Sequence, residues 1–80
     1  MIFLIEYDRS SGTITEMRKF DESSRKLAEE SRLELELRLN REGVQHEVVL
    51  LEAPSEEALH HTHSRYFENV AEIAREKLTA

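Results

Sequence analysis

The chain has 80 residues, a formal net charge of −6 at pH 7 and no cysteine. Chains divide into several cores only at roughly 250 residues, so residues 1–80 are predicted to form a single domain, and the acidic balance excludes a broad nucleic-acid surface. The lack of cysteine excludes disulfides and thiolate metal sites, and it favours a cytoplasmic location.

The first predicted strand covers residues 2–7. Both of its faces are apolar, as in a central strand, and the run ends at Glu6, too early for a signal peptide or a membrane span. Residues 8–12 are a turn cluster that predicts a hairpin to a second strand at residues 13–20. That strand alternates poorly and is rich in charge, so we expect a sheet edge with a bulge near Met17.

The next predicted element is a helix from about residue 22 to residue 40. Asp21 suits an N-cap, Gly43 suits the end, and the segment between them contains no Val, Ile, Thr or aromatic residue. Residues 33–39 nevertheless alternate leucine with charged residues, which is typical of a strand. A second hairpin is therefore the alternative.

A helix would place leucines on two opposite faces. The face that can pack on the sheet is formed by Ala28, Ser31, Leu35 and Leu39. At about 100° per residue, Leu33 and Leu37 point in nearly the opposite direction. A short chain without disulfides is only marginally stable. We therefore expect Leu33 and Leu37 to form a homodimer interface. The alternative is that the C-terminal half of the second helix covers them within one chain.

A third strand is predicted at residues 44–53, where Pro54 ends it, and Ser55 caps a second helix that runs to about Leu78. A crossover connection would give sheet order 3-1-2 with both helices on one face. The predicted class is α/β (α+β), a small two-layer ββαβα sandwich that resembles a ferredoxin-like fold without its last strand, a likeness of fold only. The expected core is Phe3, Ile5, Leu35, Val48, Leu50, Leu59, Tyr66 and Val70.

Three histidines in the second predicted helix suggest a metal site. His60 and His63 are three residues apart, and Glu56 lies one turn earlier, so together they could offer two imidazoles and a carboxylate to a divalent metal. Packing of His63 and the helix dipole at Glu56 explain the same residues without a metal. His46 is expected to pack against the second helix near Tyr66 or Val70, with a hydrogen bond from its ring.

The sequence carries no strong catalytic motif. It has only two glycines and no Gly-rich phosphate loop, and its serines, histidines and aspartates show no triad spacing. We expect a non-enzymatic accessory or regulatory domain that acts through protein–protein contacts as a homodimer, without a cofactor and without nucleic-acid or membrane partners. The alternatives are a metal- or small-ligand-binding domain that uses Glu56, His60 and His63, or a hydrolase with a metal at those residues. A cleft between the hairpin and the second helix could also bind an anion or a small polar ligand through Arg9 or Arg65.

Overall fold

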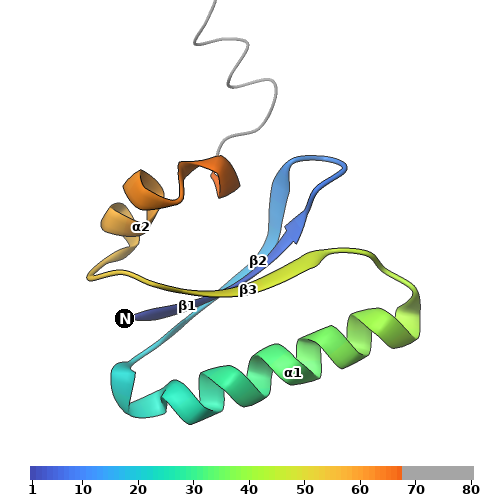
Figure 1. Ribbon diagram of the computed structural model, residues 1–80, viewed down its shortest axis with the longest axis horizontal. Helices are drawn as coiled ribbons and strands as arrows, with labels where there is room; N and C mark the ends of the chain where they lie inside the picture. The colour runs from blue at the N-terminus through green and yellow to red at the C-terminus, as the bar shows by residue number, and fades with distance from the viewer. Residues whose placement is uncertain (68–80) are drawn as a thin grey trace, which may run out of the picture.

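The sheet is the centre of the molecule. The computed structural model describes residues 1–67, in which β1 (Ile2–Asp8) pairs antiparallel with β2 (Thr13–Phe20) on one side and with β3 (Glu47–Glu52) on the other. The strand order β2-β1-β3 confirms the predicted sheet order and the α+β class. Figure 1 shows the three strands crossing between two helical layers.

The first helical layer is α1 (Arg25–Glu42), preceded by the short 3-10 helix η1 (Glu22–Ser24). Residues 33–39 are thus helical, and the hairpin alternative is wrong. Gly43 ends the helix with φ +69°, and its N–H bonds back to the carbonyl oxygens of the last turn. That left-handed conformation is easiest for glycine, which has no Cβ to clash.

The predicted bulge is present, at Thr15, two residues before Met17. Glu6 pairs with Glu16, while the next residue, Tyr7, pairs with Ile14, so Thr15 is the extra residue on β2. The bulge reverses the side to which later residues point. It therefore explains the poor alternation of this strand, because Ile14 and Met17 both pack on the same side of the sheet despite their odd spacing.

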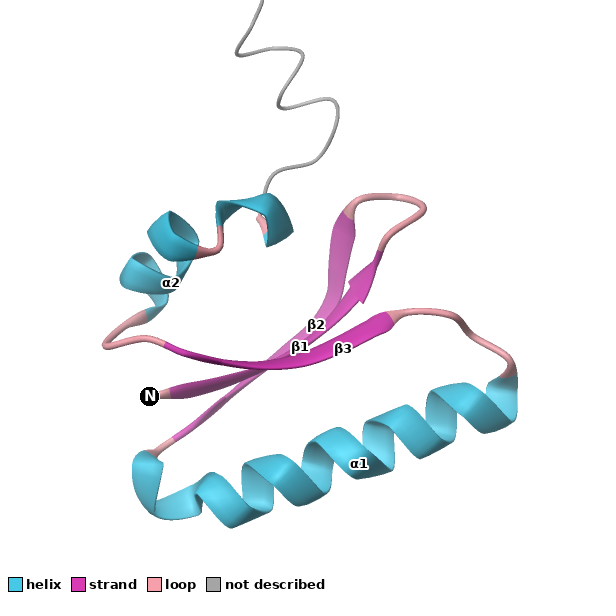
Figure 2. Ribbon diagram, in the orientation of Figure 1, coloured by secondary structure: helices cyan, strands magenta, loops and turns pink. Residues whose placement is uncertain are grey.

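The two helices lie on opposite faces of the sheet, as Figure 2 shows, so the prediction that both share one face is wrong. Leu4 packs with Leu35 and Leu39 of α1. Phe3 and Ile5 instead pack with Leu59 of α2 (Glu56–Thr62). The protein is therefore three layers deep, and β1 is buried because each of its faces has its own cover.

The second helix is shorter than predicted. Ser55 caps α2 by accepting a hydrogen bond from the N–H of Ala58, but the helix stops at His63, whose φ of −128° and ψ of 46° are not helical. A 3-10 turn, η2 (Ser64–Tyr66), follows. The rest of the predicted helix lies outside the described residues, as does Val70 of the expected core.

Most of the expected core is confirmed, in two separate clusters. Phe3, Ile5, Leu35, Leu59 and Tyr66 are buried, and Val48 and Leu50 are partly buried against the α1 cluster. The expected set left out Ile2 and Leu4, which are also almost fully buried. They belong to the face that the two-layer prediction left without a helix.

Candidate functional site

The outer face of α1 carries the leucine pair that the sequence singled out. Leu33 is 55% exposed and Leu37 is 52% exposed, although both are large apolar side chains. The predicted inward face is confirmed, because all four of its members are buried: Ala28, Ser31, Leu35 and Leu39. Within residues 1–67, α2 and η2 lie on the other face of the sheet, and Figure 1 shows no helix or strand on the outer side of α1.

A third leucine of α1 is also exposed. Leu27 is 53% accessible, and sequence reasoning did not select it. On a helical wheel Leu27 lies about 80° from Leu37 and also about 80° from Leu35, so it falls on the border between the exposed and the buried face. A shallow groove of about 340 Å³ between α1 and β2 borders Leu37, with Arg18 and Arg41 in its walls.

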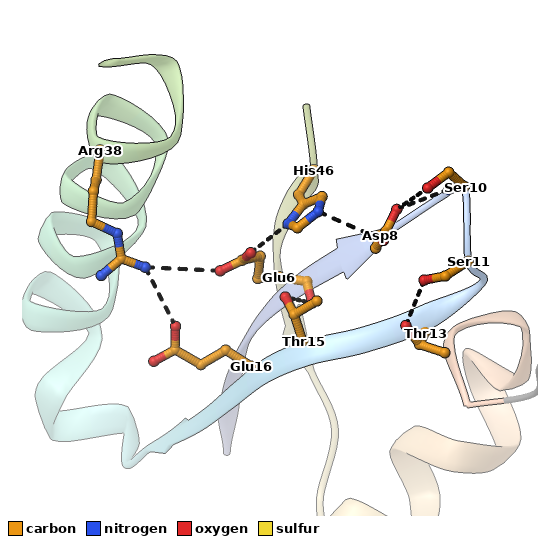
Figure 3. A network of polar contacts seen from close by, with 9 residues as sticks. All are labelled: Glu6, Asp8, Ser10, Ser11, Thr13, Thr15, Glu16, Arg38 and His46. Carbon is orange, nitrogen blue, oxygen red and sulfur yellow. Dashed lines mark hydrogen bonds and ion pairs between the residues drawn. The ribbon is translucent and has the colours of Figure 1, made fainter. Parts of the chain in front are cut away.

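A polar network lies on the same side of the sheet as α1, at the C-terminal end of β1 (Figure 3). Glu6 is only 6% exposed, and its Oε2 lies 2.5 Å from Nδ1 of His46. Nε2 of His46 lies 3.8 Å from Oδ2 of Asp8. An ionised carboxylate accepts but cannot donate, so the ring N–H at Nδ1 donates to Glu6. The expectation that His46 packs near Tyr66 is therefore wrong.

Arg38 links this network to α1. Its guanidinium lies 3.9 Å from Oε1 of Glu6 and 3.9 Å from Oε2 of Glu16. Burial raises the pKa of Glu6, but hydrogen bonds led by His46, together with the charge of Arg38, outweigh it, so the pKa lies below the usual 4.5. Glu6 is therefore a buried anion whose partners, Arg38 of α1, Thr15 of β2 and His46 before β3, come from three separate segments.

An open depression lies beside His46. It measures about 810 Å³ and is lined by Asp8, Arg9, Ser10, Gln45, His46 and Glu47. Side-chain and backbone hydrogen bonds from Ser10 and Ser11 lower the pKa of Asp8 to about 2. The Ser10 hydroxyl donates to Asp8 at 2.7 Å. That hydroxyl thus supports the turn, and the depression offers a polar surface rather than an activated nucleophile.

The three proposed metal ligands are only partly brought together. Nε2 of His60 lies 3.8 Å from Oε1 of Glu56, whose other oxygen pairs with Lys19 at 2.8 Å. The ring of His60 stacks on Phe67 with centroids 3.7 Å apart, and His63 contacts the Thr62 hydroxyl at 2.9 Å. Over residues 1–67, no group of three or more histidine or acidic side chains forms a set that could hold a metal ion.

Arg65 belongs to an aromatic cluster on the face of the sheet that α2 covers. It donates to the Tyr66 hydroxyl at 2.5 Å and lies 4.4 Å above the centre of that ring, and Glu47 lies 3.4 Å away. Tyr7 meets Tyr66 edge to face at 5.1 Å. These contacts hold η2 against the sheet. Of the two arginines predicted for an anion site, Arg65 is therefore engaged with protein groups. Arg9 instead lines the depression beside His46.

No family model, no curated protein and no solved structure matches the chain. In the part of the chain that is described, no helix combines the length and the apolar character that crossing a bilayer requires.

Proposed function

We propose that this chain is a non-enzymatic accessory domain that acts through protein–protein contacts and forms a homodimer through the outer face of α1. The observation that carries the proposal is the exposure of Leu33 and Leu37, at 55% and 52%, on a helix whose other side is buried in the core. The lack of cysteine supports a reducing compartment such as the cytoplasm.

The leucines alone give weak association. Each is about half exposed, so covering one yields roughly 1 kcal/mol, and the four leucines of a dimer yield about 4 kcal/mol. Lost translational and rotational freedom costs at least about that much. A measurable dimer therefore needs further contacts around the leucines, and we expect dissociation in the micromolar to millimolar range.

Sedimentation equilibrium tests this proposal. The parent chain should show reversible dimerisation as its concentration rises to about 500 µM, in line with weak interfaces. Leu33→Glu with Leu37→Glu should remain monomeric, because the interface would then bury carboxylates. Leu27→Glu is the matched control, since Leu27 is 53% exposed on the same helix and lies outside the leucine pair.

Two results would contradict the proposal. One is a parent chain that stays monomeric at that concentration. This is also what an intramolecular cover over Leu33 and Leu37 would produce. The other is a double variant that associates as the parent does, since association would then use another surface.

A further inference from the structure

We propose that the partner on this face is a second copy with its α1 antiparallel to the first, so that Leu33 contacts Leu37 of the other copy and Glu30 pairs with Arg41 across the interface. This inference rests on the proposed function, because it assumes that the leucine pair is covered by another chain. It adds an orientation, a register and two identical ion pairs.

The positions around the helix support this arrangement. Leu33 and Leu37 lie about 40° apart at roughly 100° per residue, and the line midway between them is the centre of the contact face. On the same scale Glu30 lies about 40° from that line and Arg41 about 60° from it, both on the side of Leu37. The two opposite charges therefore flank one edge of the leucine pair.

The heights along the helix bring these charges together. When Leu33 of one copy is level with Leu37 of the other, residue 30 is level with residue 40 of the other copy. Glu30 and Arg41 then differ in height by one residue, about 1.5 Å. A twofold axis perpendicular to two antiparallel helices brings the same flank of each helix together, so the Glu30–Arg41 contact forms twice.

Neither charge has an ion-pair partner within residues 1–67. The ion pairs that α1 makes within residues 1–67 involve Arg25, Arg32, Glu36 and Arg38, whereas Glu30 and Arg41 are exposed and make none in that range. Arg41 also borders the groove beside Leu37, where an incoming side chain has room.

A parallel pair of helices is disfavoured by charge. Lys26 falls on the centre line of the contact face at about 100° per residue, so a parallel twofold would place it against Lys26 of the other copy. In the antiparallel register Lys26 is level with residue 44, which lies beyond the end of α1 at Gly43. Like charges held face to face repel, so the charge pattern selects the antiparallel orientation.

The test exchanges charges between the two positions. Glu30→Lys alone and Arg41→Glu alone each turn both predicted ion pairs into repulsive pairs, so each variant should dimerise at least about tenfold more weakly than the parent at low salt. When the two variants are mixed, every contact again joins opposite charges. The mixture should form a heterodimer with an affinity near that of the parent. Glu57→Lys is the matched control, since Glu57 is exposed on α2 and its change alters the net charge by the same amount as Glu30→Lys.

The outcomes separate this inference from the proposed function. Heterodimers in the mixture, detected by sedimentation with one chain labelled, support the antiparallel register. A mixture that associates no more tightly than either variant alone overturns the register, even where the parent dimerises and the Leu33→Glu, Leu37→Glu variant does not. A parent chain that is monomeric at about 500 µM overturns both proposals, because the interface itself is then absent.

Discussion

Leu35→Ala tests the packing of α1 on the sheet. Leu35 is 3% exposed and packs against Leu4 and Leu39, with Val48 and Leu50 partly buried around them. A buried leucine truncated to alanine costs about 2–5 kcal/mol. Because Val48 and Leu50 are only partly buried, the site can contract around the cavity, and we expect the lower part of that range, about 2–3 kcal/mol.

That loss is a large part of the total stability. A chain of this length is stabilised by roughly 4–12 kcal/mol, and each kcal/mol shifts the melting temperature of such a domain by about 4–8 °C. Leu35→Ala should therefore melt roughly 10–20 °C below the parent. The assay is thermal and urea unfolding followed by circular dichroism at low micromolar concentration, where association contributes little.

Leu27→Ala is the matched control for this experiment. It makes the same chemical change in the same helix, but Leu27 is 53% exposed, so its cost should stay below about 1 kcal/mol. The reasoning is refuted if the two variants unfold at the same urea concentration. Leu35 would then contribute no more than a solvent-facing leucine, and α1 would present a different face to the sheet.

Two further predictions concern charge and metal. Glu6 has a folded pKa below its usual 4.5, so its ionised form contributes stability at neutral pH that is lost as the pH falls from about 4.5 through the lower folded value. Glu6→Gln should flatten this part of the urea-midpoint profile, and an unchanged profile would contradict the role of the His46 contact. Zinc at about 100 µM should shift the melting temperature by less than about 1 °C, because only Glu56 and His60 come together. A larger rise that His60→Ala abolishes would restore the metal hypothesis.

The order of the elements and the two faces of α1 follow from local sequence patterns. Strong helix formers between Asp21 and Gly43 outweighed the alternating leucines at residues 33–39, because helix formation depends on hydrogen bonds and side-chain contacts within four residues. The same periodicity places Leu35 inside and Leu33 outside, so the leucine pair of the proposed interface can be predicted from the sequence.

The polar network joins residues that are far apart in the chain, so it could not be predicted from local sequence patterns. His46 and Glu6 are 40 positions apart, and the sequence gives no sign that they meet. The contact depends on the pairing of β1 with β3. The pairing of β1 with β2 places Glu16 directly opposite Glu6, on the same side of the sheet. The charge of Glu6 could be read from its residue type, but its burial and its partners could not.

The side on which α2 packs was also decided only in three dimensions. The apolar residues on both faces of β1 indicated that each face needs a cover, yet connection rules alone allowed both helices on one face. That arrangement would have left Ile2 and Leu4 in water, whereas both are 1% exposed between the sheet and its helical layer. Local propensity fixes where a helix begins and ends, but the face it covers depends on how much apolar surface each side of the assembled sheet still exposes.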